Sequence, residues 1–203
     1  KLDVNTLNKD GFNKLHLAAT DIKNPDILDY ILRESVNEIY AKSKDGLTPV
    51  HMSILVERAF RDAKLKGESP FDKFWNKGIT FSMTDKNGNA LLHTAAAVNA
   101  DNIIEKILNV KIPGLLEAKN NDGNTPLHIA VMAHARNATE KLVNMGAKLD
   151  SKNKENKTPL DIATDKDFQD LEKFLKNPKG GMPVPYETKE EKKAKEEAAK
   201  AKK

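Results

Sequence analysis

The chain has 203 residues, no cysteine, and a formal net charge of +4 that is small beside its 34 basic and 30 acidic residues. The lack of cysteine excludes disulfides, thiol nucleophiles and cysteine-ligated metal centres, and it fits both the cytoplasm and a secreted location. Only four basic residues are arginine, and the excess of lysine falls in residues 178–203, so the rest of the chain is close to neutral. We therefore expect no nucleic-acid binding by the folded part and, without a long apolar run, a soluble chain that does not insert into membranes.

A nine-residue phrase recurs five times along the chain. Its copies are residues 10–18, 45–53, 87–95, 122–130 and 155–163. The repeats begin near residues 11, 46, 88, 123 and 156, at successive spacings of 35, 42, 35 and 33 residues. Self-similarity at such a period predicts a stack of supersecondary units rather than one globular core.

Each part of the phrase has a local structural meaning. An Asp-Gly or Asn-Gly pair predicts a turn, because glycine takes a positive φ without a steric clash, and Asn156 can substitute for glycine in the fifth copy because asparagine tolerates the same region. Thr48 stands where a helix N-cap belongs and Pro49 at the first helical position, and the same pair recurs in the fourth and fifth copies. The phrase therefore predicts a tight turn followed by a short first helix.

A second amphipathic helix is expected after each first helix. Its apolar positions are Ile27, Leu28, Tyr30, Ile31 and Leu32, then Phe71, Phe74 and Trp75, then Ile103, Ile104, Ile107 and Leu108, then Leu142 and Val143, and finally Phe168, Leu171, Phe174 and Leu175. Each set follows the helical period, so we interpret all of them, including Trp75, as core.

Two copies depart from the pattern. The second carries an insertion at about residues 57–69, whose Phe60 and Leu65 either pack back on the repeat or reach a partner, with packing favoured. In the fifth, Asp161 replaces a histidine and residues 165–170 are polar, as expected of a terminal repeat that caps the stack.

The phrase Thr-Pro-Leu-His-Ile-Ala at residues 125–130, together with the 33-residue period, resembles the ankyrin-repeat family. The resemblance implies an all-α repeat fold over residues 1–177, an ankyrin solenoid of about five helix-turn-helix repeats with hairpin-like turns. Residues 2–5 look like the segment that ends such a repeat. Residues 178–203 form a Pro/Gly linker and a Lys/Glu/Ala-rich tail, which we expect to be disordered or a solvated helix.

Four histidines, His16, His51, His93 and His128, occupy one slot in successive copies, which favours a shared structural role over catalysis. The resemblance implies that each one hydrogen-bonds the neighbouring turn. His134 lies outside the slot and is expected to be exposed at a helix end. Because no nucleophile, phosphate-loop or metal-ligand motif is present, we expect no enzyme activity, no cofactor and no metal site.

The resemblance also implies where a partner binds, namely the turn tips and the exposed side of the first helices, which together form a concave face. Tip candidates are Lys44, Leu47, Lys86, Asn89, Asn121 and Asn124, and first-helix candidates are Thr20, Leu55, Ala97 and Met132. Leu47, Leu55 and Met132 stand out, because apolar side chains in exposed slots suggest a patch that is covered by a partner, although isolated exposed apolar residues are also ordinary.

The leading interpretation is a monomeric protein-protein interaction scaffold whose partner is another protein. The alternative is a substrate-recruiting or targeting module of a larger enzyme or of a secreted bacterial effector whose catalytic part is absent from this chain. A third hypothesis is that the lysine-rich tail docks on an acidic surface such as nucleic acid or anionic lipid.

Overall fold

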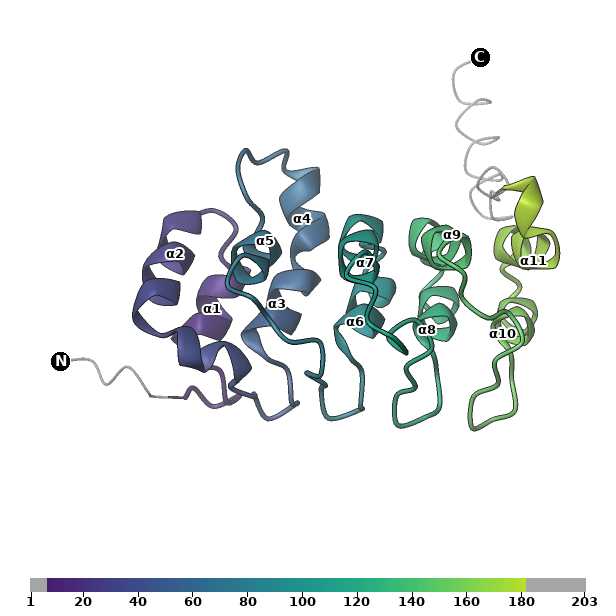
Figure 1. Cartoon of the computed structure of the whole chain (residues 1–203), viewed down its shortest axis with the longest axis horizontal. Coiled ribbons are helices and arrows are strands. Elements are labelled where there is room, and N and C mark those ends of the chain that lie inside the picture. The colour runs from purple at the N-terminus through teal and green to yellow at the C-terminus, as the bar shows by residue number, and fades with distance from the viewer. Residues whose placement is uncertain (1–6, 182–203) are drawn as a thin grey trace, which may run out of the picture.

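The computed structural model describes residues 7–181, and the helices of this part lie side by side in a single row (Figure 1). Residues 1–6 and 182–203 lie outside the described residues, so the predictions for residues 2–5 and for the tail fall there too. Residues 7–181 contain eleven α-helices and two 3-10 helices, with an isolated antiparallel bridge between Thr84 and Ala90. The predicted all-helical fold class is confirmed.

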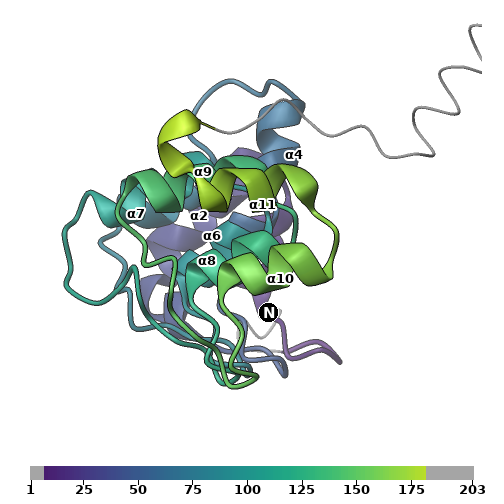
Figure 2. The same ribbon diagram turned by 90° about the vertical axis from the view of Figure 1, so that its right-hand side faces the viewer.

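Each of the five repeats contributes a first helix and a second helix. The first helices are α1 (Lys14–Thr20), α3 (Pro49–Leu55), α6 (Leu91–Ala97), α8 (Pro126–Met132) and α10 (Pro159–Asp165). The second helices are α2 (Pro25–Glu34), α5 (Pro70–Trp75), α7 (Asp101–Leu108), α9 (Arg136–Asn144) and α11 (Gln169–Lys176). Successive first helices contact one another along the row, and Figure 2 shows them in one layer with the second helices in a layer above.

The first helices begin where the sequence predicts. Thr48 accepts a hydrogen bond from the backbone N–H of His51, and Thr125 and Thr158 cap α8 and α10 in the same way, each followed by proline. Asn13 substitutes for threonine as the cap of α1, whereas Ala90 has no side chain that can cap α6. Asn156 adopts φ +62°, which confirms its role as the replacement for the turn glycine.

The core runs continuously between the two helical layers. Phe71 and Phe74 are fully buried, and the half-buried Trp75 packs against Phe71 with their ring centroids 5.8 Å apart. The core interpretation is wrong for Ile27 and Tyr30 of α2, which are 48% and 66% exposed. No repeat precedes α2 within the described residues, so this side of the helix has no neighbour.

The insertion of the second repeat forms an additional helix, α4 (Glu57–Asp62), which follows α3 almost directly. Phe60 is buried, as the packing alternative predicts, whereas Leu65 is 39% exposed. The helix is attached to α7 of the next repeat, since Asn102 donates a hydrogen bond of 2.8 Å to Glu57 and Arg61 pairs with Asp101 at 3.3 Å. The insertion therefore reinforces the contact between the second and third repeats.

Two short 3-10 helices complete the described residues: η1 (Val36–Tyr40) follows α2, and η2 (Pro178–Gly180) follows α11. The last repeat has a mostly polar outer surface, as predicted for a cap, with Asp161 and Asp165 exposed. Asp170 differs from that prediction, because it is 3% exposed and pairs with Arg136 and His134 of the fourth repeat.

Candidate partner-binding face

The turn tips form a regular ladder along one edge of the row (Figure 1). Within each tip, a polar side chain three residues before the glycine position accepts hydrogen bonds from the backbone of the turn; in the fourth repeat, Asn120 Oδ1 accepts from the N–H groups of Asp122 and Asn124. The backbone N–H of Lys86 donates to the carbonyl of Asp45 in the previous tip at 2.9 Å, and equivalent bonds join the other tips. The tips are thus rigid relative to one another.

Close approach between tips explains why glycine occupies their apex. Gly46 has φ +74°, and a Cβ atom built on it would lie 2.5 Å from the backbone nitrogen of Lys86. Any side chain there would break the contact between successive turns. Gly78 has the same φ but no atom within 4 Å of a built Cβ, so only its backbone conformation favours glycine.

The four histidines of the repeated phrase join each first helix to the next tip. Their Nε2 atoms lie 2.9, 3.4, 3.0 and 3.1 Å from carbonyl oxygens of the following repeat, those of Leu47, Asn89, Asn124 and Lys157. In each case Nδ1 accepts the backbone N–H of the helix N-cap at 3.2 Å. Since Nδ1 accepts, Nε2 carries the proton and donates, which confirms the predicted structural role.

This geometry fits neutral imidazole rings, and Nδ1 of His16 also lies 2.6 Å from Asn13 Oδ1. The side chains of His16, His51, His93 and His128 are at most 1% exposed. Burial lowers the pKa of each of them below the usual value of 6.5, and the hydrogen bonds to backbone carbonyls only partly oppose that shift. The joints between repeats are therefore formed by uncharged hydrogen bonds.

The first helices leave a regular set of side chains uncovered by the tips. The seventh and last residue of each first helix is Thr20, Leu55, Ala97, Met132 and Asp165 in turn, and all but the half-buried Thr20 are exposed. The fourth residue is Leu17, Met52, Thr94, Ile129 and Ile162, of which Leu17 is 52% exposed. Positions four and seven share one side of a helix, so the exposed members of these two rows form one surface, the first-helix face.

Sequence reasoning found only one of these two rows. Leu17 is more exposed than Leu55 and Met132, which are both 42% exposed, yet its slot was not among the predicted site residues. The signal was available, because position four is apolar in four of the five copies and lies three residues before the predicted slot.

The predicted tip residues divide into two groups. Lys44, Lys86 and Asn121 are exposed, and Lys86 pairs with Asp45 across adjacent tips. Leu47 and Asn89 are half-buried. The exposure expected for Asn124 is wrong: it is 5% exposed, and its Oδ1 accepts a hydrogen bond of 2.9 Å from Asn153.

The asparagine side chains explain this division. Asn89 Oδ1 likewise accepts a bond of 2.8 Å from Asn120, so both Asn89 and Asn124 form side-chain links between adjacent repeats. A side chain whose oxygen already holds the next repeat contributes to stacking rather than to a free surface. Lys44, Lys86 and Asn121 therefore remain the exposed candidates among the tip residues, whereas Asn89 and Asn124 hold adjacent repeats together.

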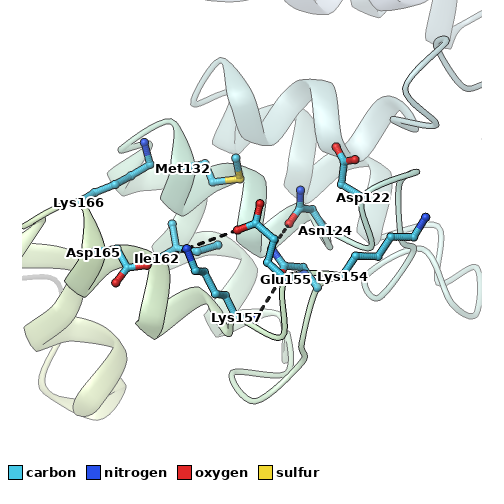
Figure 3. A pocket seen from close by; sticks show the side chains of 10 residues that line it. Asp122, Asn124, Met132, Lys154, Glu155, Lys157, Ile162, Asp165 and Lys166 are labelled. Atoms are coloured by element: carbon cyan, nitrogen blue, oxygen red, sulfur yellow. Dashed lines mark hydrogen bonds and ion pairs between the residues drawn. The ribbon is translucent and has the colours of Figure 1, made fainter.

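At its C-terminal end the first-helix face deepens into a cavity of about 250 Å³. Met132 and Ile162 are its apolar lining residues, and Figure 3 shows charged side chains around them. Lys157 lies 3.4 Å from Glu155 and 3.0 Å from Asp165, and these three side chains together carry a net charge of −1. The remaining lining residues are Asp122, Asn124, Asn153, Lys154 and Lys166.

Comparison with known proteins agrees with the repeated phrase. A family model described as "Ankyrin repeats (3 copies)" matches residues 72–153 and again residues 92–182. Together the two matches span residues 72–182, more than half of the chain. The chain belongs to the ankyrin-repeat family. A comparison with individually curated proteins gave no significant match.

Ankyrin repeats are in general protein-protein interaction modules. Within residues 7–181, no three or more histidine, aspartate or glutamate side chains are grouped so as to hold a metal ion. None of the helices in the same residues is long and apolar enough to cross a membrane.

His134, outside the repeated slot, belongs to the junction of the last two ankyrin repeats. Its ring stacks on Phe168 with the centroids 4.1 Å apart, and its Nε2 lies 2.9 Å from Oδ1 of the buried Asp170. Its side chain is 41% exposed, in line with the predicted position after a helix end. Burial and the nearby Arg136 charge lower its pKa. We interpret this histidine as a contact of the capping repeat.

Proposed function

We propose that this ankyrin-repeat chain binds a protein partner through the first-helix face and the exposed tip residues Lys44, Lys86 and Asn121. The supporting observation is a set of uncovered apolar side chains in two adjacent rows of the first helices: Leu17 in the fourth position is 52% exposed, and Leu55 and Met132 in the seventh position are each 42% exposed. Because successive repeats place these slots at regular intervals on rigidly joined helices, the apolar groups form one surface rather than isolated residues.

The chemistry of this surface favours a protein partner with apolar anchors. Exposed apolar side chains gain free energy when a partner covers them, and a few such anchors usually dominate the affinity of a protein interface. The tip residues add polar contacts at the border, where they fix orientation more than affinity. Three lysines and three carboxylates line the cavity beside Met132, so its charges balance and suit an uncharged side chain.

The test is affinity capture with matched variants. Leu55→Glu/Met132→Glu places charges on the first-helix face, and Val110→Glu/Ile112→Glu, at residues that are 43% and 40% exposed in the loop after α7, is the control. We expect wild type and control to recover the same partner, and the first variant to bind it at least about tenfold more weakly, because two central anchors are lost. Equal affinity of all three proteins would refute the proposed face.

A further inference from the structure

A cavity of about 270 Å³ lies between the second helices of the first two repeats and shares no residue with the first-helix face. Its lining residues come from α2, from α5 and the turn after it, and from the loop that joins α4 to α5: Asp29, Arg33, Glu68, Lys73, Asn76 and Lys77. Figure 1 shows that this loop rises above the layer of second helices. Because all six side chains are polar or charged, the cavity favours a charged ligand over an apolar one.

Stacking of the repeats accounts for part of this charge. Lys73 of α5 pairs with Asp29 of α2, and the Lys73 side chain is 10% exposed. Equivalent ion pairs join α7 to α5 through Lys106 and α9 to α7 through Lys141. Lysine at this place in the second helix thus belongs to a ladder that connects successive repeats, and Lys73 needs no ligand to explain it.

Arg33 and Lys77 are not part of that ladder. Both are exposed, and neither forms an ion pair with another of residues 7–181. A cation near the end of a helix stabilises the helix dipole, but the repeats do not require one at this position. The ninth residue from the start of α7, α9 and α11 is Asn109, Asn144 and Asn177, where α2 has Arg33. Arg33 therefore departs from the repeat pattern, as the neighbouring insertion does.

The inserted loop adds to this positive charge. Lys64 and Lys66 precede Glu68, and both lysines are exposed and form no ion pair in the described part of the chain. Glu68 accepts a hydrogen bond of 2.9 Å from Asn76. We call these two lysines and the lining residues the basic cavity; its five basic and two acidic side chains give a net charge of +3, whereas residues 1–177 as a whole carry +1. Such a local excess attracts a partner of opposite charge.

We propose that the basic cavity binds an acidic segment of a protein partner, with a glutamate or aspartate carboxylate seated against Arg33 and Lys77. A guanidinium group presents paired donors that match the two oxygens of a carboxylate, and an ammonium group adds a further donor. Residues 182–203 do not complement the cavity, because their seven lysines exceed their five glutamates. The basic cavity is therefore a second interaction surface, separate from the first-helix face and independent of the function proposed above.

An NMR titration of the isotope-labelled chain tests this proposal. The probe is a short peptide of alternating glutamate and glycine, and the matched peptide has glutamine in place of glutamate. The glutamate peptide should shift the amide signals of α2 and of residues 64–77. Arg33→Ala/Lys77→Ala should bind it at least about tenfold more weakly, because charge-assisted hydrogen bonds are lost. Lys148→Ala/Lys152→Ala, which removes two exposed lysines between α9 and α10, should bind it like wild type.

Three outcomes would overturn the proposal. The first is the absence of amide shifts at up to about 5 mM glutamate peptide, a concentration that fills even weak sites. The second is equal affinity of Arg33→Ala/Lys77→Ala and the control variant, and the third is equal binding of the glutamine peptide. All four replaced side chains are exposed, so the variants should fold, and circular dichroism checks that they do.

Discussion

The first helices of the fourth and fifth repeats are nearly the same in sequence, but only that of the fourth repeat is joined to a following tip. Both begin with Thr-Pro-Leu and continue with Ile-Ala, yet the third helical residue is His128 in one and Asp161 in the other. His128 spans from its own N-cap to the carbonyl of Lys157 in the next tip at 3.1 Å. Asp161 accepts hydrogen bonds only within its own cap, from the N–H and the hydroxyl of Thr158.

The difference shows what the repeated histidine is for. Capping a first helix requires only an acceptor, which aspartate supplies at the end of the stack. Joining that helix to the next tip requires an acceptor and a donor on opposite sides of one rigid ring, which neutral histidine supplies. Histidine therefore occurs in this slot in each copy that has a following tip.

Removing an interior histidine should lower the stability of the fold more than the other substitutions considered below. His93→Ala leaves the Ala90 N–H without its partner, removes one of the two hydrogen bonds to the Asn124 carbonyl and creates a cavity, so we expect it to lower the free energy of unfolding by about 3 kcal/mol. Asp161→Ala loses only capping bonds at an exposed site, those from the N–H and the hydroxyl of Thr158, and should cost about 1 kcal/mol. Urea unfolding measures both, and equal losses would contradict the distinction between joint and cap.

Substitution of a tip glycine should also lower stability, because the glycine lies against the next repeat. Gly46→Ala should destabilise the chain by about 2 kcal/mol more than Gly78→Ala, because only Gly46 would drive its Cβ into the backbone of the next tip. Both glycines have φ +74°, so the cost of the backbone conformation is matched. If the two variants unfold at the same urea concentration, close packing between tips is not what selects glycine.

Acidification should weaken the joints. The four buried histidines have lowered pKa values in the folded chain, so the unfolded chain binds more protons as the pH falls below about 6.5. Stability is then present above that pH and lost as the pH falls further, by at most about 1.4 kcal/mol per pH unit for each histidine. Urea midpoints measured between about pH 8 and pH 5, above the usual range of carboxylate titration, should decrease; a constant midpoint would contradict neutral, buried rings.

Restoring the repeat pattern at the last position should have the smallest effect. Asp161→His recreates the phrase of the fourth repeat, but within the described residues no tip follows to accept a bond from Nε2. We expect a change within about 0.5 kcal/mol in thermal or urea unfolding, as for other exposed sites. A clear gain in stability would show that the histidine acts within its own repeat, against the account given for the interior joints.

Local patterns predicted most of the fold. The Thr-Pro caps, the turn glycines and the positive φ of Asn156 follow from backbone chemistry within a few residues, and the structure places all of them as expected. The errors at Ile27 and Tyr30 have another cause. Helical periodicity shows that a side is apolar, but not whether a neighbouring repeat covers it.

The candidate site was less predictable for a similar reason. Asn124 stands at a tip in the sequence, but its side chain accepts a bond from Asn153, 29 residues away, and no local pattern reveals that pairing. Leu17 was missed because its slot is buried or half-buried in the other repeats and is exposed only at the first. Exposure within a repeat array depends on position in the stack as well as on the repeat pattern.

The protonation state of the four repeated histidines tests the account most directly. Nitrogen-detected imidazole NMR spectra recorded at about pH 6, near the ordinary histidine pKa, distinguish the Nε2–H tautomer from the imidazolium form. The account predicts that His16, His51, His93 and His128 all remain neutral with the proton on Nε2. Titration of any of them near pH 6.5, or a proton on Nδ1, would contradict the hydrogen bonds that join the repeats.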